Sequence, residues 1–436
     1  MSAVSVQEHG LPSFSSTIGH EPYEYYERLR ELGPVVWDDS LNAWLVTSME
    51  LSKEVLRNDQ VDWMPPEKHA GPPMPGLDRQ RWKDFMAYES SKTLHVDDFG
   101  EHNRMHRWWM RTFSGRALQV LGDTLVRPVA HAQIDRFAEA GQAELYEDFA
   151  NRVAPRVIAA AMGLPWEDDD WLAHVLDLHV RRIALIGHKF ILQRSGAEPD
   201  PELLRSGYAA VDELAELARP FVRERRNGEG TDFISMVWRG ADDLFGSEYD
   251  EQDVIATVNI AFAGGSGTTA AATAAGLYLM MTRDGLQDGL RDDLEMIPRF
   301  VEETLRLYPS IVSTVRMAMH DVELGGVTIR EGELMMLLTG ALNRDPEHYA
   351  CPYDVNFERP APRDHLAFMR GTQTCPGQGL ARTQLSTIFS VALERLDDLH
   401  LDPSMPPPAY TDPFVRRWRP LHATFTSREH TAAAGR

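Results

Sequence analysis

Cys375 is one of only two cysteines in a chain of 436 residues. It lies in the turn-rich stretch HLAFMRGTQTCPG, residues 365–377, and a helix-like run follows directly. Backbone N–H groups that converge at a helix start, together with the positive end of the helix dipole, favour the thiolate form of a cysteine. The stretch therefore predicts a thiolate that acts as a nucleophile or as a metal ligand.

The surrounding residue types narrow that chemistry. A nucleophile needs a base, and the sequence fixes no histidine beside Cys375. A zinc site needs partner ligands at short spacings, and none surround this cysteine. A single thiolate fits a haem, because the porphyrin supplies four of the iron ligands. The other cysteine, Cys351 in HYACPYD, has no such frame, and we interpret it as a small core residue.

The elements that must position this cysteine are mostly helical. Apolar residues recur at three-to-four spacing in six segments: 20–32, 146–164, 203–227, 254–281, 295–308 and 380–396. Strand-like runs form an N-terminal hairpin at 33–48 and a second pair around Gly325 and Gly326. We predict a mainly α single domain with a small β portion over residues 21–428, an N-terminal extension at 1–20 and a flexible tail at 429–436.

Charge and hydropathy exclude several classes. Lys and Arg number 44 against 66 Asp and Glu, a net charge of −22, which disfavours nucleic acid as a partner. The N-terminal stretch MSAVSVQEHGLPSFSS lacks a basic start followed by an apolar core, which favours a cytoplasmic protein. The uncharged run 254–281 is long enough to span a bilayer. Polar residues and glycines inside it instead predict a buried helix, so we expect no membrane anchor.

FMRGTQTCPG resembles the haem-binding loop of the cytochrome P450 superfamily. That loop has a phenylalanine, a glycine three residues on, and then the ligand cysteine and a glycine at fixed spacing. Phe368, Gly371, Cys375 and Gly377 match all four positions. The resemblance implies the haem-thiolate monooxygenase fold, with heme b (iron protoporphyrin IX) as cofactor and Cys375 as axial ligand of the iron.

Further stretches follow the family's order and extend the resemblance over nearly the whole chain. EETLR supplies a Glu-x-x-Arg pair at Glu303 and Arg306, whose spacing places both side chains on one helix face. FERP supplies Arg359 as the third member of an ion-pair cluster that is structural in the family. GGSGTT lies in the middle of the uncharged run, and residues 315–346 resemble the family's sheet region.

By resemblance, the haem propionates are bound by His102, His106, Arg316 and Gln373. Two of these depart from the family, which usually has arginine at the place of His106 and histidine at that of Gln373. We therefore expect neutral hydrogen bonds to the propionates, or recruitment of Arg107. A rival interpretation takes His102 and His106 as zinc ligands at i, i+4, but the glutamate of H-E-x-x-H is missing.

The mid-helix motif implies the catalytic residues and departs further. Thr268 stands at the family's oxygen-activating threonine, while Gly267 stands where an acid is usual. Three alternatives remain open: Ser266 and water carry the proton relay, an acid arrives from elsewhere, or the reaction needs less protonation than ordinary hydroxylation. The glycines also suggest a helix backbone that opens beside the bound oxygen.

Positions that resemble the family's substrate pocket are mostly apolar or aromatic, which suits a hydrophobic small organic molecule. They are Trp82, Phe85, Met86, Tyr88, Asn259, Phe262, Ala263, Ile311, Val312 and Phe414. The stretch 64–80, with five prolines and two glycines, predicts a binding or gating loop.

The family resemblance implies insertion of one atom of O2 into such a substrate. Electrons would come from a separate ferredoxin and an NAD(P)H-dependent reductase, since no G-x-G-x-x-G follows a strand. An acidic redox partner fits a basic cluster formed by Arg104, Arg107, Arg111, Arg370 and Arg382. Two alternatives are a peroxide-driven or otherwise atypical haem-thiolate enzyme, and a non-catalytic haem-binding protein.

Overall fold

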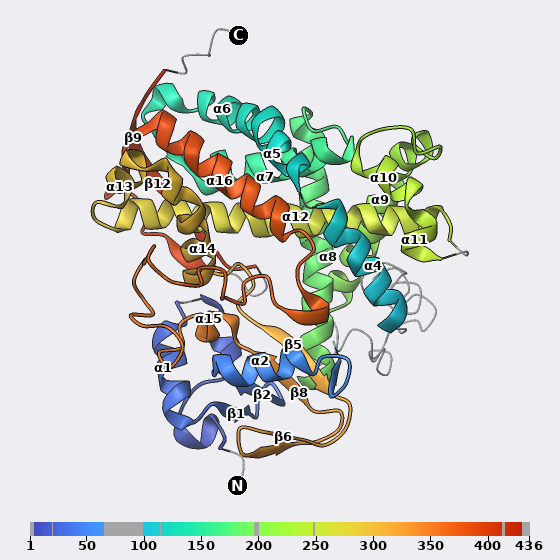
Figure 1. Ribbon diagram of the computed structural model, residues 1–436, viewed down its shortest axis with the longest axis vertical. Helices are drawn as coiled ribbons and strands as arrows, with labels where there is room; N and C mark the ends of the chain where they lie inside the picture. Colours follow the sequence, from blue (N-terminus) through green and yellow to red (C-terminus); the bar gives the residue numbers. More distant parts are fainter. Residues whose placement is uncertain are drawn as a thin grey trace.

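The computed structural model describes residues 4–19, 21–64, 99–113, 115–195, 200–246, 249–411 and 415–429. One long helix, α12 (Glu251–Thr282), crosses the molecule, and other helices pack around it (Figure 1). Its start is fixed by a capping box. The carboxylate of Asp250 accepts the N–H groups of Gln252 and Asp253, and the carboxylate of Asp253 accepts the N–H of Asp250.

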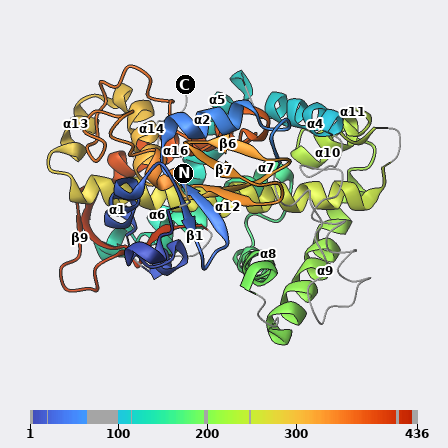
Figure 2. The same cartoon turned by 90° about the horizontal axis from the view of Figure 1, so that it is seen from below.

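The other helices lie on two sides of α12. Helices α8 (Asp169–Ser195) and α9 (Pro201–Glu224) pack together below α12 in Figure 2, whereas α4 (Phe99–Thr112) and α16 (Gln378–Arg395) lie above it. The other α-helices of the described residues are α1 (Tyr23–Leu32), α2 (Met49–Arg57), α5 (Arg116–Leu121), α6 (Arg127–Asp135), α7 (Asn151–Met162), α10 (Phe233–Arg239), α11 (Ala241–Phe245), α13 (Leu286–Asp292), α14 (Ile297–Leu307) and α15 (Thr339–Leu342).

The β portion is small, as predicted. A five-stranded sheet has the order β1 (Val35–Asp38), β2 (Ala43–Val46), β8 (Leu334–Leu337), β5 (Thr314–Ala318), β3 (Trp63–Met64), with only β2 and β8 parallel. Both expected hairpins are confirmed, β1 with β2 and β6 (Val322–Leu324) with β7 (Val327–Ile329). The rest are β4 (Gln142–Glu144), β9 (Leu396–Leu401), β10 (Ala409–Thr411), β11 (Arg417–Arg419) and β12 (His422–Ser427).

Helix α12 confirms the prediction of a buried helix. Within the described residues it alone is long and apolar enough to cross a membrane, and 61% of its most apolar window is buried inside the protein. Its second half is packed almost entirely in the main core together with side chains of α14 and α16. The helix is therefore the structural axis of a folded core.

The N-terminal stretch is integrated into the same core over its described part. Val6, Leu11 and Phe14 are buried in the main hydrophobic cluster. The buried carboxylate of Asp38 accepts hydrogen bonds from the Ser13 hydroxyl and the Phe14 N–H. Residues 4–17 thus pack against the domain that begins with α1, and all but the first residue of the expected tail at 429–436 lie outside the described residues.

Candidate functional site

Cys375 lies between a 3-10 turn (Gly371–Gln373) and the start of α16. Its N–H donates to the carbonyl of Phe368 over 2.8 Å, which closes the loop. Gly371 has φ +73°, and a Cβ built there would lie 2.7 Å from the carbonyl oxygen of Leu56 at the end of α2. Glycine is required at 371 both by its left-handed backbone and by this close approach.

The sulfur of Cys375 accepts the N–H groups of Gly377 and Gln378, as expected at a helix start. Burial nevertheless raises the pKa of this thiol, and the N–H groups and the charge of Arg382 offset that rise only in part. The backbone N–H groups favour the thiolate, as expected, but desolvation of the sulfur outweighs them. A metal bound to the sulfur would supply the missing positive charge.

Helix α4 brings both predicted histidines to this loop. His102 lies with Nε2 2.9 Å from the carbonyl oxygen of Thr372, and His106 with Nε2 2.6 Å from that of Thr374. The two rings stack with centroids 5.8 Å apart. The side-chain amide nitrogen of Gln373 lies 3.2 Å from Nε2 of His102. Three of the four residues expected to bind propionates thus meet at one side of the loop.

Arg316, the fourth, reaches the loop through a residue that sequence reasoning missed. Its Nε donates to the buried carboxylate of Asp59 over 2.9 Å, and the Thr372 hydroxyl donates to the same carboxylate over 2.7 Å. Asp59 therefore balances the charge of Arg316 and joins it to the cysteine loop. No motif marks Asp59, because its role depends on a contact between residues 257 positions apart in the chain.

The zinc interpretation of His102 and His106 gains no support. Across the described ranges, no group of three or more His, Cys, Asp or Glu residues is arranged to hold a metal ion. The two histidines donate to loop carbonyls instead. Cys351 is exposed, with φ +50°, so its assignment to the core is wrong. It follows Ala350 in a polar loop whose carbonyl groups face Arg359.

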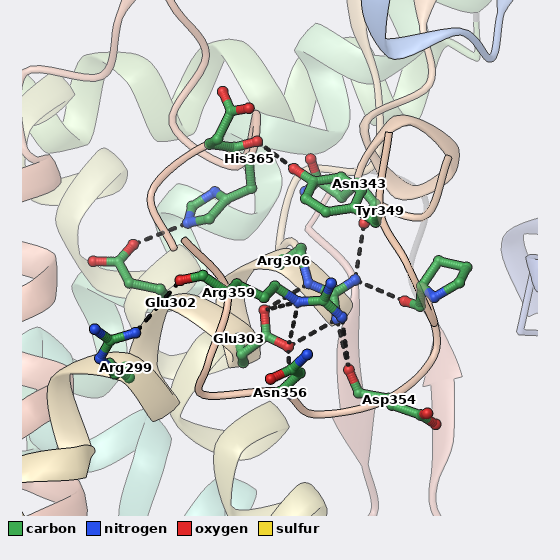
Figure 3. Close-up of polar contacts among 12 residues, drawn as sticks. Arg299, Glu302, Glu303, Arg306, Asn343, Tyr349, Asp354, Asn356, Arg359 and His365 are labelled. Carbon is green, nitrogen blue, oxygen red and sulfur yellow. Dashed lines mark hydrogen bonds and ion pairs between the residues drawn. The ribbon is translucent and has the colours of Figure 1, made fainter. Parts of the chain in front are cut away.

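The predicted ion-pair cluster is confirmed (Figure 3). The guanidinium of Arg306 donates to both oxygens of Glu303, over 2.7 and 2.9 Å, and Nε of Arg359 lies 3.1 Å from each of them. Burial opposes ionisation of Glu303, yet the two arginines keep its pKa below the usual range. Arg306 also donates to the carbonyl of Asn343, so the cluster ties α14 to the loops that precede Cys375.

The middle of α12 has one open face and one packed face. A Cβ built on Gly264 or Gly267 would meet no atom within 4 Å, and Gly264 is exposed in mid-helix. A Cβ on Gly265 would lie 2.5 Å from Ile158 of α7. Ala263 and Thr268 are partly buried, like Gly267. The open face therefore leaves room for a group as flat and close as a macrocycle beside the helix.

The α12 backbone is regular around Thr268. The Thr268 hydroxyl donates to the carbonyl of Gly264 over 2.7 Å, and α12 continues as α-helix through this segment. The expected opening of the backbone is absent from the described helix, which is continuous from Glu251 to Thr282. The carbonyl of Thr268 also accepts the hydroxyl of Ser310 over 2.8 Å, which joins α12 to the segment after α14.

Three predicted residues belong to the packed face instead. Ser266 is buried, with its hydroxyl 3.5 Å from the carbonyl oxygen of Ala263. Phe262 stacks on His179 of α8 with ring centroids 5.1 Å apart. Asn259 and Phe262 line a small cavity toward α8 and α9 together with Leu164, Trp171, Val175 and Leu214. The structure thus separates Ser266, Asn259 and Phe262 from Thr268, because helical geometry turns them about a third to half a turn away.

The remaining pocket positions divide. Val312 is buried in the main core, and Ile311 is partly buried and follows Ser310, whose hydroxyl bonds to Thr268. Trp82, Phe85, Met86, Tyr88 and Phe414 lie outside the described residues, as does most of the expected loop at 64–80.

Residues 310–316 join the open face of α12 to the cysteine loop. Ser310 contacts Thr268 of α12, and Arg316 contacts Asp59, which contacts Thr372 of the cysteine loop. A partly buried cysteine that accepts backbone N–H groups, joined in this way to an open helix face, is the arrangement of a haem-thiolate protein. The glycine face and the N–H donors of the two histidines fit such a cofactor.

Comparison with known proteins agrees with this class. The cytochrome P450 family model matches residues 188–425. Mycinamicin IV hydroxylase/epoxidase of Micromonospora griseorubida is 32% identical over 82% of this chain and 83% of its own length. Vitamin D3 dihydroxylase of Streptomyces griseolus is 26% identical over 92% of this chain and 93% of its own length. A crystal structure of P450BioI with an acyl carrier protein that carries hexadec-9Z-enoic acid superimposes with a TM-score of 0.78 at 23% identity, over 93% of this chain and 98% of that one.

The chain belongs to the cytochrome P450 family. Membership implies a haem cofactor and monooxygenase chemistry.

Proposed function

We propose that this protein is a haem-thiolate monooxygenase that inserts one atom of O2 into a hydrophobic or aromatic small organic molecule. Cys375 is the axial ligand of heme b. The observation that carries the proposal is the partly buried Cys375, whose sulfur accepts two backbone N–H groups at the end of a loop closed onto Phe368. When bound, the haem iron supplies the activation of dioxygen.

The loop and α4 hold the propionate side. His102 and His106 carry protons on Nε2, since both nitrogens donate to loop carbonyls, so either can offer an N–H to a carboxylate after a small rotation. Arg316 is already paired with Asp59 and contributes little net charge. This site therefore binds propionates chiefly through neutral hydrogen bonds, which agrees with the departures at positions 106 and 373.

Proton delivery falls to Thr268 and water. The Thr268 hydroxyl is the polar side chain of the open face, and the space beside Gly267 would hold water where relatives carry an acid. Ser266 is turned to the packed face and is a poor relay. A hydroxyl that already donates to the Gly264 carbonyl can still accept a hydrogen bond from water and orient that water for proton delivery.

Electrons would come from a separate ferredoxin and its NAD(P)H-dependent reductase in the cytoplasm. Of the five arginines expected to bind an acidic partner, Arg107 and Arg111 are exposed, four residues apart on α4. Arg370 pairs with Asp364, and Arg104 donates to the carbonyl of Asp243. Arg107 and Arg111 are the exposed members of this set, and exposure is what favours them for docking.

One observation favours a second candidate, a peroxide-driven or otherwise atypical haem-thiolate enzyme. Position 267 carries no acid, and of the two hydroxyl residues beside it Ser266 faces away, which leaves Thr268 alone on the open face. A peroxide-driven enzyme brings its own protons with the oxidant and needs no such relay. Turnover with hydrogen peroxide in the absence of reductase would select this candidate, and turnover that requires the ferredoxin would select the first.

The assignment of Cys375 is tested by the ferrous carbonyl complex. Thiolate ligation shifts its Soret band strongly to the red, and Cys375→Ser should abolish that band while Cys351→Ser leaves it intact. The reverse result would overturn the assignment. Screening apolar compounds for a change in the iron spin state tests the substrate class, and a protein that shows no such change with any compound and no turnover would be a non-catalytic haem protein.

A further inference from the structure

Glu302, the residue before the glutamate of the ion-pair cluster, is a second buried carboxylate that faces the cysteine loop. Its side chain is 5% exposed. Arg382 of α16 donates to both of its oxygens, over 2.7 and 3.1 Å, and Nε2 of His365 lies 3.0 Å from one of them. Arg363 reaches it from the surface over 3.3 Å.

These contacts fix the chain on both sides of Cys375. Before the cysteine, His365 donates to Glu302 through Nε2 and accepts the N–H of Ala367 on Nδ1 over 3.2 Å. This places the segment whose next residue, Phe368, accepts the N–H of Cys375. After the cysteine, Arg382 donates to the side-chain oxygen of Gln378 over 2.9 Å. The N–H of Gln378 is one of the two that bond to the sulfur.

The charges in this cluster are balanced in a particular way. Burial opposes ionisation of Glu302, but His365 and Arg382 lower its pKa to about 2, so the carboxylate is charged. Burial lowers the pKa of His365, so this ring is neutral near pH 7. Arg382 is only 16% exposed and lies 4.6 Å from the ring centroid of Phe368. Arg382 is therefore committed to the loop and is poorly available for partner docking.

We propose that Glu302 is a positioning residue for the Cys375 thiolate, which holds Arg382 against the ligand loop with its charge neutralised and thereby sets the reduction potential of the bound cofactor. The inference rests on the proposed role of Cys375 as ligand. Reduction adds negative charge at the iron, so an unbalanced cation beside the sulfur favours the reduced state and an unbalanced anion disfavours it.

The sign of the change separates this role from simple support of the loop. Glu302→Gln leaves the charge of Arg382 unbalanced and should raise the reduction potential. Arg382→Gln leaves the carboxylate unbalanced and should lower it. The double variant should return close to the parent value. Loosening of the loop, by contrast, would move both single variants in the same direction and weaken the red-shifted Soret band of the carbonyl complex.

The measurement is a spectroelectrochemical titration of substrate-free protein at one pH, with the carbonyl spectrum recorded for each variant. Arg363→Gln is the matched control, because this arm of the cluster is 73% exposed and its loss should leave the potential unchanged. Shifts of the same sign in Glu302→Gln and Arg382→Gln, or no shift in either, would overturn the inference.

Two further readings keep the test decisive. If Glu302→Gln fails to retain haem, Arg382→Lys against Arg382→Gln decides the matter, since lysine keeps the charge and should give the higher potential. Equal potentials for those two variants would contradict the proposal. A parent protein without the red-shifted Soret band would contradict the assignment of Cys375 instead, so the two failures are distinguishable.

Discussion

The two sides of the proposed haem site, the cysteine loop with α14 and the open face of α12, differ in how their polar groups are used. On α14, the adjacent residues Glu302 and Glu303 are both buried and both accept several N–H groups from arginines and a histidine around the cysteine loop. On α12, Gly264 and Gly267 leave open space, and Thr268 supplies a single hydroxyl. A permanent ligand needs a fixed position, whereas the reacting side needs room for oxygen, water and substrate.

The largest expected effect is on stability, at the ion-pair cluster of Glu303. Glu303→Gln would leave Arg306 and Arg359 buried without their shared carboxylate, and we expect a loss of about 3–5 kcal/mol in the free energy of unfolding. Haem retention should fall with it, because Arg306 also donates to the carbonyls of Asn343 and Pro352 in the preceding loops. Urea unfolding and haem content per chain measure both.

The matched control for that variant is Glu358→Gln, which removes an exposed carboxylate beside Arg359 in the chain. It should change the free energy of unfolding by less than about 0.5 kcal/mol. Equal unfolding midpoints for Glu303→Gln and Glu358→Gln would show that the buried ion pairs do not fix the side of the site that carries the cysteine loop.

The next effect compares two glycines of α12. A Cβ on Gly276 would lie 2.1 Å from the Phe389 ring of α16, so Gly276→Ala should destabilise the protein by about 1–3 kcal/mol. Gly267→Ala meets no atom within 4 Å and should instead stabilise it, by up to about 1 kcal/mol, because alanine is the better helix former. Opposite signs in urea unfolding of the two variants would confirm the open face, and a loss of stability in Gly267→Ala would contradict it.

The sequence predicted the parts of this site that depend on local pattern. The ion pair of the Glu-x-x-Arg motif and the buried apolar helix were confirmed, and the cysteine loop lies directly before a helix as its pattern predicts. What it could not predict depends on which way a side chain faces. Asn259 and Phe262 share a helix with Thr268, but the packing of α8 and α9 decides that they line a different cavity.

Contacts between distant segments were also beyond the sequence. Asp59 lies in a turn after α2 with no motif, yet it neutralises Arg316. Glu302 belongs to no motif, because the Glu-x-x-Arg pattern of the family begins at the next residue, Glu303. The raised pKa of Cys375 follows from burial, which a local reading of the turn and helix start cannot supply. Each miss is a tertiary effect that overrides a local tendency.

Removing one hydroxyl from each face of α12 tests the difference between its open and packed faces. Thr268→Ala removes the hydroxyl of the open face and should raise the peroxide released per NAD(P)H consumed, because protons then reach bound oxygen without direction. Ser266→Ala is the control, since its buried hydroxyl faces the packed side, and coupling should stay at the parent value. Unchanged coupling in Thr268→Ala, or uncoupling in Ser266→Ala, would show that the relay uses another route.

The smallest expected effect lies at the sulfur itself. Gly377 and Gln378 both give their N–H groups to Cys375, while Pro376 between them has none to give. Pro376→Leu restores an N–H at an apolar position. Such a bond to an anionic sulfur withdraws charge and favours the reduced iron, so the reduction potential should rise. A bond of about 0.5–1.5 kcal/mol, gained mainly in the reduced state, corresponds to a rise on the order of tens of millivolts.

Pro376→Ala separates this account from a change in loop stiffness. Alanine restores the same N–H without the bulk of leucine, so both variants should raise the potential by a similar amount if the hydrogen bond is the cause. If proline only stiffens the turn, both variants should lose stability in urea while the potential stays at the parent value. An unchanged or lowered potential in folded, thiolate-ligated Pro376→Leu and Pro376→Ala would exclude the hydrogen-bond account. The reduction potential would then be set by charge alone, through Glu302 and Arg382.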